Sequence, residues 1–296
     1  MADAVQAPLD VFCRATLNFA ARDREMLGAP VSLDILDGRT AELPGWEGCG
    51  FERVAHRSAV TSWDDEELIA THHGEMEALA RRMTGADVAL VSNHIKRGPE
   101  HAARHQDLGP ISFVHSDFAI GYDQLVRRSF IDRTAEGPAR ALARNGLTAD
   151  DVADASRLVI LQFWRNLGPA KMDFPLAFCD ARTVAPNDVR PIPVSDYAGS
   201  GIDFDALAVL EPRGSAPYRW YAFPELGIDE VVAFRTYDTE LVDRGDTWFT
   251  PHSAFRDPDV EVGRPARSSI ELRAICLYAS CPELTLSRAP AARGSL

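Results

Sequence analysis

Short apolar segments separated by turn signals fill the second half of the chain, and this pattern restricts the fold more than any other feature. The turn signals are Asn166-Leu167-Gly168-Pro169, Gly199-Ser200-Gly201 and Glu211-Pro212-Arg213-Gly214. Several short strands with such punctuation are typical of a β-sandwich or a jelly roll. We therefore predict a mainly β fold with flanking helices, with strands over residues 158–164, 175–179, 219–223, 231–237 and 269–278.

Helical patterns lie mainly in the first half. Over residues 64–83, acidic residues crowd the first turn and basic residues the last, as the helix dipole favours, and Gly85 follows. Residues 120–156 are also expected to be helical. Residues 1–60 alternate short apolar runs with Gly and Pro, which predicts strands and loops, and residues 88–91 predict a short buried strand.

Charge and composition exclude several classes of partner. The net charge of −13 argues against nucleic acid and against anionic membrane surfaces, because both require clustered Lys and Arg. The sequence contains no apolar run of about 18 residues and no basic start followed by an apolar stretch, so we expect neither a membrane span nor a signal peptide. Five cysteines without a C-x-x-C pair fit reduced thiols in a cytoplasm. We expect a cytoplasmic protein with a small-molecule partner, and the sequence sets no oligomeric state.

A candidate metal-binding pair lies in the segment 111–118. The segment alternates with period two, so Ile111, Phe113, His115 and Asp117 should share one face of a strand. An H-x-D pair is weak evidence by itself, because polar strand residues often point to solvent. A carboxylate on a face that Ile111 and Phe113 should bury would, however, need a partner, and a metal would supply one.

A second candidate histidine, His252, follows far downstream. An isolated histidine is more often a surface or capping residue, but Trp248, Phe249 and Phe255 suggest that this one is partly buried. Two histidines and one carboxylate can occupy one face of an octahedral Fe(II) and leave the opposite face open. We therefore predict His115, Asp117 and His252 as metal ligands and catalytic residues.

The segment 267–278 offers a polar stripe. Arg267, Ser269, Glu271 and Arg273 lie on one face, and apolar residues lie on the other. Such a stripe either faces solvent, as on an edge strand, or points into the mouth of a barrel. In the second case an arginine could hold a carboxylate co-substrate in a bidentate grip.

Other sites are weaker. Histidines at 72, 73, 94, 101 and 105 could supply zinc ligands, but the first two face different directions on a helix and nearby Lys and Arg repel a cation. We expect these histidines to be solvated loop residues. The sequence contains no G-x-S-x-G, Walker or G-x-G-x-x-G motif.

Three blocks carry a family resemblance. They are Phe163-Trp164-Arg165-Asn166-Leu167 with residues 174–184, then residues 230–238, then Pro251-His252-Ser253-Ala254-Phe255 with residues 269–274. Together they resemble the gibberellin-desaturase-like and cephalosporin 7α-hydroxylase-like family of Fe(II)/2-oxoglutarate-dependent oxygenases. The resemblance covers roughly residues 90–280, and its motifs are specific in combination.

The resemblance implies a double-stranded β-helix, which is a cupin-like jelly roll, with Fe(II) held by His115, Asp117 and His252. It also implies that 2-oxoglutarate and O2 are co-substrates and that succinate and CO2 are released. Arg267 with Ser269 matches an R-x-S pattern of related oxygenases and is our first choice for the far carboxylate of 2-oxoglutarate, with Arg273 as the second. Arg165 and Trp164 are expected near the substrate pocket, although Trp164 is more simply explained by packing.

These observations give one domain over residues 1–296. Residues 1–60 should form an N-terminal extension packing on the barrel, residues 85–280 the β-helix core, and residues 287–296 a disordered tail. The main functional hypothesis is hydroxylation or desaturation of a small specialised metabolite. The same ligands would also suit a metal-dependent hydrolase or isomerase on a cupin-like barrel, and a non-catalytic small-molecule-binding barrel is the third hypothesis.

Overall fold

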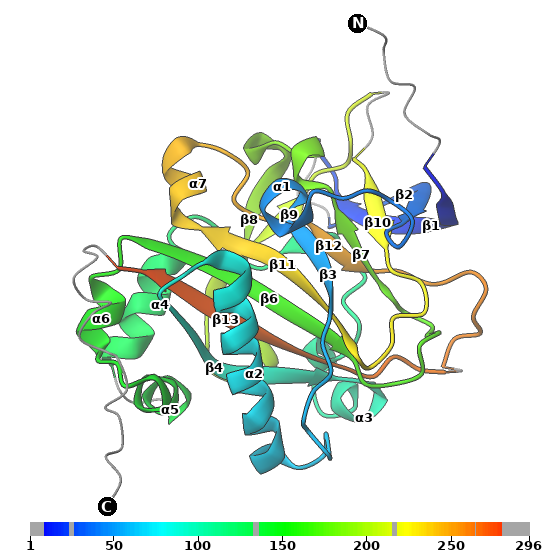
Figure 1. Cartoon of the computed structure of the whole chain (residues 1–296). Coiled ribbons are helices and arrows are strands. Elements are labelled where there is room, and N and C mark those ends of the chain that lie inside the picture. The colour runs from blue at the N-terminus through cyan, green and yellow to red at the C-terminus, as the bar shows by residue number, and fades with distance from the viewer. Residues whose placement is uncertain (1–8, 24–26, 133–135, 215–217, 264, 280–296) are drawn as a thin grey trace, which may run out of the picture.

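Two β-sheets enclose the core of the molecule (Figure 1). The computed structural model describes residues 9–23, 27–132, 136–214, 218–263 and 265–279. The larger sheet has eight strands, in the order β1 (Val11–Ala20), β2 (Leu27–Asp37), β10 (Trp220–Ala222), β7 (Leu176–Cys179), β12 (His252–Ala254), β5 (His115–Ser116), β9 (Phe204–Val209) and β8 (Val189–Val194). The smaller sheet has five, in the order β3 (Phe51–Ala55), β11 (Glu230–Asp238), β6 (Arg157–Asn166), β13 (Ser269–Tyr278) and β4 (Val88–Arg97).

Strand β6 shows how the smaller sheet separates two apolar layers. Side chains alternate across a strand, so neighbouring residues of β6 pack on opposite faces. Leu158 and Ile160 belong to the core between the sheets, together with Trp220 of the larger sheet. Val159 and Leu161 belong to a second cluster on the outer face. Burial on both faces explains why this strand is a nearly continuous apolar run.

Helix α2 (Glu66–Thr84) covers that outer face. Its apolar residues Met76 and Leu79 pack against the sheet, and Figure 1 shows the helix lying across β11, β6 and β13. The Asp65 side chain caps its N-terminus by accepting hydrogen bonds from the backbone N–H groups of residues 67 and 68. Gly85 ends the helix in the left-handed region, at a φ of 67°. The predicted helix at residues 64–83 is therefore confirmed to within two residues.

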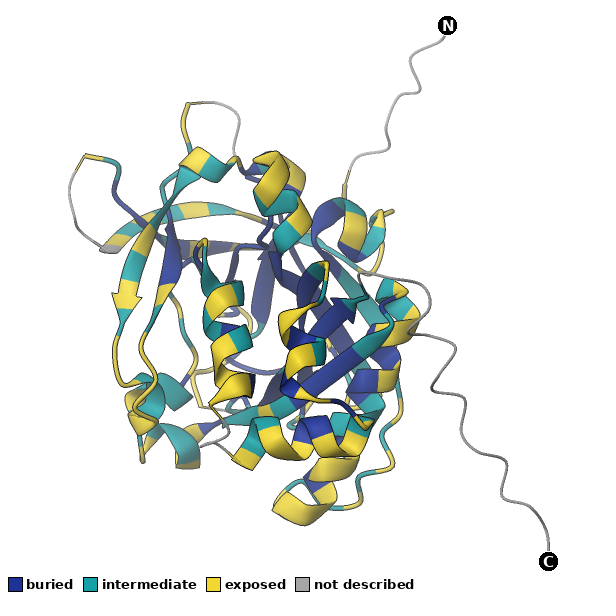
Figure 2. Ribbon diagram, turned by 90° about the vertical axis from the view of Figure 1, so that its left-hand side faces the viewer, coloured by how far each residue is buried: buried dark blue, intermediate teal, exposed yellow. Residues whose placement is uncertain are grey.

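The remaining helices lie around the sheets, with their exposed faces toward solvent (Figure 2). Helix α5 approaches β4 closely at Gly137, where a Cβ atom would lie only 2.5 Å from the Ser92 carbonyl oxygen. The helices are α1 (Gly45–Cys49), α3 (Pro99–Ala102), α4 (Tyr122–Ile131), α5 (Glu136–Asn145), α6 (Ala149–Ala153) and α7 (Thr239–Arg244).

The expected mainly β architecture with flanking helices is confirmed, but two local expectations need correction. Residues 111–118 do not form a full strand: only His115–Ser116 does, while Phe113 makes an isolated bridge to Asn18. Ile111 and Phe113 are half-buried rather than buried.

The expected N-terminal extension, residues 1–60, supplies β1 and β2 to the larger sheet and β3 to the smaller one. The expected tail, residues 287–296, lies outside the described residues.

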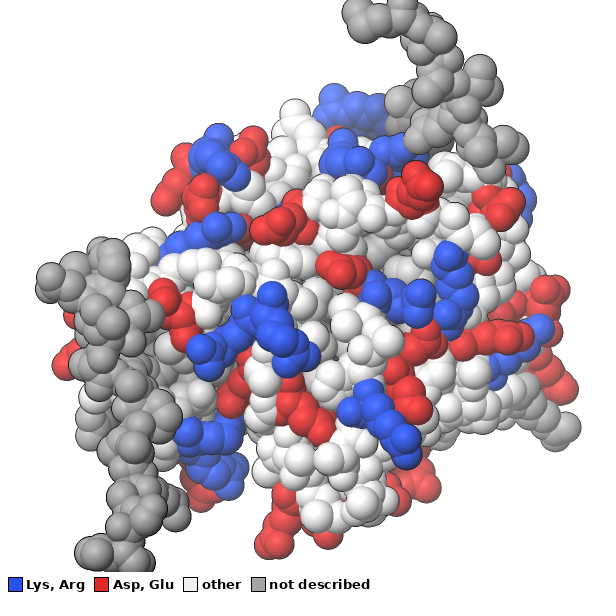
Figure 3. Space-filling view, viewed as in Figure 1, with Lys and Arg blue, Asp and Glu red and all other residues white. Residues whose placement is uncertain are grey.

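The surface carries both signs of charge. On the face shown in Figure 3, Lys and Arg are interspersed with Asp and Glu, so this face offers no broad basic track. Among the described residues, no helix combines the length and apolar character needed to cross a membrane. Cys13, Cys49, Cys179 and Cys276 are free thiols in buried positions, and Cys281 lies outside the described residues.

Candidate metal centre

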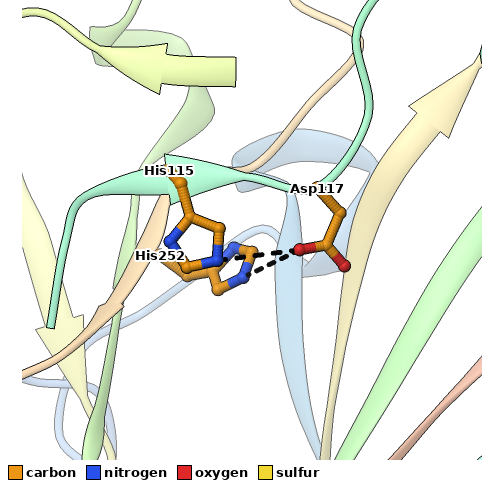
Figure 4. Close-up of side chains that lie close together, drawn as sticks. All are labelled: His115, Asp117 and His252. Carbon is orange, nitrogen blue, oxygen red and sulfur yellow. Dashed lines mark ion pairs between the residues drawn. The ribbon is translucent and has the colours of Figure 1, made fainter. Parts of the chain in front are cut away.

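Adjacent strands of the larger sheet bring three predicted ligands together. His115 opens β5, His252 opens β12, and the two residues are direct partners in the antiparallel ladder. Asp117 follows β5, and its Oδ1 lies 3.7 Å from Nε2 of His115 and 3.6 Å from Nε2 of His252. Figure 4 shows both imidazoles turned toward this oxygen. Within the described residues, this is the one group of three or more His, Cys, Asp or Glu whose ligand atoms all lie within 4.8 Å of one another.

Backbone carbonyls fix the tautomer of both imidazoles. Nδ1 of His115 lies 2.7 Å from the Phe113 carbonyl oxygen, and Nδ1 of His252 lies 3.0 Å from the Thr250 carbonyl oxygen. A carbonyl oxygen can only accept, so each Nδ1 must carry the proton and donate. In each ring, Nε2 is therefore the nitrogen that faces Asp117. Such orientation of a histidine by a hydrogen bond on its other nitrogen is typical of metal ligands.

Asp117 divides its two oxygens between different partners. Oδ2 accepts from Nε of Arg273 at 3.1 Å and from Nη2 of Arg273 at 2.8 Å, whereas Oδ1 faces the imidazoles. Burial by itself would raise the pKa of Asp117, but Arg273 and His252 outweigh it, and the net shift is downward. Asp117 is therefore ionised, and one of its oxygens is available to a cation.

The donor set fits a divalent transition metal. Burial, followed by the nearby His252, lowers the pKa of His115 to about 4, so this imidazole is neutral at pH 7. The site then offers two imidazole nitrogens and one anionic oxygen, which is the 2-His-1-carboxylate set that non-haem Fe(II) enzymes use. Because His115 and Asp117 need no deprotonation at pH 7, binding of a metal to these two groups would not compete with protons there.

Arg267 is a buried cation with a free donor. Its side chain is 3% exposed, its Nε donates to Ser269 Oγ at 3.1 Å, and its guanidinium carbon lies 5.1 Å from the centre of the Trp164 ring. Burial, followed by the nearby Arg97 cation, lowers the pKa of Arg267 to about 9. Among the described residues, Nη1 of Arg267 and Nε1 of Trp164 are buried without a hydrogen-bond partner. Two unpaired buried donors at one place suit a carboxylate.

Arg267, just before β13, and Arg273, within β13, thus differ in the partners that they already bind. Arg273 is occupied by Asp117, and its guanidinium carbon lies 5.3 Å from the centre of the Phe118 ring. Arg267 retains the unpaired Nη1. The existing partners therefore distinguish the two predicted candidates for the co-substrate carboxylate. Arg273 is already engaged, whereas Arg267 has a donor without a partner.

Trp164 and Arg165 lie on opposite faces of β6, which corrects the expectation that both approach the pocket. Trp164 packs in the aromatic cluster with Phe178 and beneath Arg267. Arg165 is on the outer face, where it donates to the His56 and Ile228 carbonyl oxygens and lies over the Trp63 ring. Side-chain alternation along a strand separates them.

The sequence reasoning missed a buried network beside the site. Arg97, at the end of β4, donates to Glu271 at 2.8 Å and to the Tyr197 hydroxyl at 2.7 Å. Gln162 lies opposite Arg273 in the β6–β13 ladder, and its buried Oε1 has no partner among the described residues. Glu271 stood out in the polar stripe, but no sequence signal identified Arg97 or Gln162.

The rival histidines are mostly not solvated loop residues, which corrects that expectation. His72 is buried in α2 beside Glu75, with Nδ1 3.2 Å from the carboxylate. His73 lies 3.0 Å from His94 of β4, and His94 pairs with Glu66 at 3.1 Å. His101 and His105 are half-exposed near α3, which ends at Ala102.

Comparison with known proteins places the chain among oxidoreductases. A family model described as "Oxidoreductase/YMDC permease-like domain" matches residues 11–277. The hydroxylase/desaturase efuI of Hormonema carpetanum is 28% identical over 238 residues, covering 77% of this chain and 77% of that protein. The Fe(II)/2-oxoglutarate-dependent dioxygenase nvfI of Aspergillus novofumigatus is 28% identical over 210 residues, covering 69% of this chain and 65% of that protein.

Solved structures agree on the fold. A variant of the iron and alpha-ketoglutarate-dependent endoperoxidase NvfI superposes with a TM-score of 0.70 at 20% identity, covering 93% of this chain and all of that one. Another structure of NvfI gives a TM-score of 0.67 over 91% of this chain and 99% of that one. The predicted cupin-like jelly roll and the predicted oxidoreductase class are therefore confirmed. The chain belongs to the family described as the oxidoreductase/YMDC permease-like domain, across nearly its whole described length.

Proposed function

We propose that this protein is an Fe(II)/2-oxoglutarate-dependent dioxygenase that hydroxylates or desaturates a small specialised metabolite. The observation that carries the proposal is the convergence of Nε2 of His115, Nε2 of His252 and Oδ1 of Asp117 at one point. This three-residue set leaves half of an octahedral coordination sphere to other ligands. The names of relatives as hydroxylase/desaturases and as a dioxygenase support the same reaction class.

The chain's own residues have separate tasks. His115, Asp117 and His252 would hold the iron, and Arg273 keeps Asp117 turned so that only Oδ1 faces it. When bound, iron, 2-oxoglutarate and O2 together supply the oxidation, with succinate and CO2 as the co-product pair. Carbonyl oxygens of Phe113 and Thr250 hold the Nδ1 protons, so neither imidazole can turn its metal-binding nitrogen away without losing a hydrogen bond.

Arg267 is the residue we assign to the far carboxylate of 2-oxoglutarate. Its unpaired Nη1, the Ser269 hydroxyl beside it and the unpaired Nε1 of Trp164 form a compact set of donors. A carboxylate there would satisfy both buried donors, each of which otherwise costs roughly 1–3 kcal/mol. Trp164 is thereby reassigned from substrate to co-substrate, while Arg165 has no part in the site.

The finer classification follows the blocks noted in the sequence. Their pattern supports a gibberellin-desaturase-like and cephalosporin 7α-hydroxylase-like branch of these oxygenases. Hydroxylation and desaturation begin with removal of the same kind of hydrogen, so the bound substrate's geometry decides between them. A cytoplasmic location and a small-molecule partner are part of this proposal.

Succinate formation tests the proposal. Purified protein with Fe(II), 2-oxoglutarate and air should release succinate slowly even without substrate, and removal of either iron or O2 should stop it. Replacing Fe(II) by Zn(II) should also stop it, since zinc has no redox chemistry. Succinate release that continues with zinc, or that never appears with iron in a folded protein, would refute an oxygenase and favour a hydrolase or a binding barrel.

A further inference from the structure

A large cavity lies next to the candidate metal centre. Its volume is about 1450 Å³, and α4, α5, β4 and the 197–204 segment contribute its walls. In Figure 1, α4, α5 and β4 lie together on the left of the molecule. At its inner end the cavity reaches Arg273, whose Nη2 is 2.8 Å from Asp117. Ligand sites are commonly about 300–1,000 Å³, so this space accommodates a molecule much larger than 2-oxoglutarate.

The inner end of the cavity is apolar and aromatic. Phe118 follows Asp117 in the chain, and its ring stacks on that of Tyr122, with centroids 3.6 Å apart. Phe204 closes on the same pair, 5.9 Å from Phe118. Ile275 and Ile160, which are partners in the β13–β6 ladder, complete this wall beside Arg273. The walls next to the metal ligands would therefore contact an apolar carbon skeleton.

The lining of the cavity is basic although the protein is acidic. The whole chain has 31 Lys and Arg against 44 Asp and Glu, but the cavity reverses this balance. Its acidic lining residues are Glu66, Glu67, Asp132 and Asp203, and its basic ones are Lys96, Arg104, Arg128, Arg140, Arg144 and Arg273.

Two of these cations are available to a ligand. Lys96 is paired with Glu66 at 2.8 Å, Arg144 with Glu77 at 2.5 Å, and Arg140 with Glu136 at 3.4 Å. Within the described parts of the chain, by contrast, no side-chain hydrogen bond or ion pair engages Arg104 or Arg128. Positive groups lining a cleft concentrate anions there, even in a protein of negative net charge.

We infer that the substrate is an amphipathic anion: a mainly apolar molecule that carries a carboxylate or similar group at the end far from the carbon that reacts. Its apolar body lies against Phe118, Tyr122 and Ile275, next to Arg273. Its anionic end lies toward one of the two unpaired arginines of the lining, Arg104 after α3 or Arg128 of α4. The part of this inference that concerns the reacting carbon rests on the proposed function. The part that concerns which class of molecule binds does not.

Two naphthalene dyes test the binding chemistry without a known substrate. The first, 8-anilinonaphthalene-1-sulfonate, combines an apolar body with an anion and fluoresces in apolar surroundings. The second, N-phenyl-1-naphthylamine, has the same body without the sulfonate. We expect the wild-type protein to bind the anionic dye more tightly. The double variant Arg104→Gln/Arg128→Gln should weaken the anionic dye about tenfold and leave the neutral dye unchanged.

Two further variants locate the dyes. Leu125→Trp, a half-buried lining residue of α4, should abolish binding of both dyes by filling the apolar part. Arg213→Gln, at an arginine that is 68% exposed and outside the lining, should change neither. Thermal unfolding of each variant verifies that it is folded.

Each other outcome overturns the inference. If Leu125→Trp leaves dye binding intact while the protein is folded, the apolar body does not occupy this cavity. If the arginine pair does not discriminate between the dyes, the ligand is not an anion. Fe(II) and 2-oxoglutarate binding, measured in the same variants, should be unchanged. If the wild type binds neither Fe(II) nor 2-oxoglutarate, the proposed function fails. The dye experiment still decides the class of ligand in that case.

Discussion

Asp117 shows how much one side chain must satisfy at a metal centre. Its Oδ2 is held by Arg273 through two hydrogen bonds, and its Oδ1 points at two imidazole nitrogens. A buried carboxylate without such partners would be costly or would take up a proton. The H-x-D pattern predicts Asp117 as a ligand, whereas the sequence points to Arg273 only as a co-substrate ligand. The sequence contains no signal that pairs positions 117 and 273, because the contact arises from facing sheets.

Arg267→Ala should raise the requirement for 2-oxoglutarate. Loss of a buried, charged hydrogen-bond donor costs roughly 2–5 kcal/mol, so we expect the 2-oxoglutarate KM to rise about 30-fold or more. Succinate formation measured across 2-oxoglutarate concentrations checks this. Arg267→Lys, which keeps the charge but loses the planar fork, should lie in between.

Iron affinity is the control for that experiment. It should be the same in Arg267→Ala and wild type, because Arg267 does not contact the three ligands. A rise of KM in Arg273→Ala with none in Arg267→Ala would reverse our assignment of the two arginines.

At the scale of elements, local patterns predicted what depends on local chemistry. Helix α2 and strands β6, β11 and β13 were predicted because each carries its own apolar periodicity, caps or turns. Strand β8 was missed because Pro191 and Pro193 interrupt it; it lies at the edge of the larger sheet, where prolines are tolerated. The pairing of β5 with β12, which places His115 opposite His252, joins segments far apart in the chain and had no local signature.

The N-terminal cap of α2 gives a prediction for this element. Asp65→Ala removes the side-chain acceptor for two backbone N–H groups and should lower the free energy of unfolding by about 1 kcal/mol. Urea unfolding measures this. Asp64→Ala is the matched control, since no cap hydrogen bond involves Asp64, and it should change stability by less than about 0.5 kcal/mol. Equal losses in the two variants would contradict the assigned cap.

For the whole molecule, three histidines that are neutral at pH 7 make stability depend on pH. Burial lowers the pKa of His72 to about 3 and the pKa values of His73 and His115 to about 4, whereas the unfolded chain has values near 6.5. Below about pH 6.5 the unfolded state therefore binds protons that the folded state does not. The free energy of unfolding of metal-free protein should fall as pH drops toward 4, by up to about 1.4 kcal/mol per pH unit for each histidine.

Urea unfolding at several pH values between 7 and 4.5 measures that slope. His72→Gln should make it shallower, because one of the three groups is then missing. A slope of zero over this range, or stability that increases on acidification, would show that these histidines are not held neutral in the folded protein.

The most direct measurement of the central claim is an anaerobic difference spectrum of Fe(II) with 2-oxoglutarate bound to the protein. The account predicts a weak visible charge-transfer band that saturates at one iron per chain and is absent in His252→Ala, with the fold of that variant verified by its unfolding transition. An unchanged band in His252→Ala, or a wild type that binds Fe(II) and 2-oxoglutarate without one, would contradict a shared iron centre at His115, Asp117 and His252.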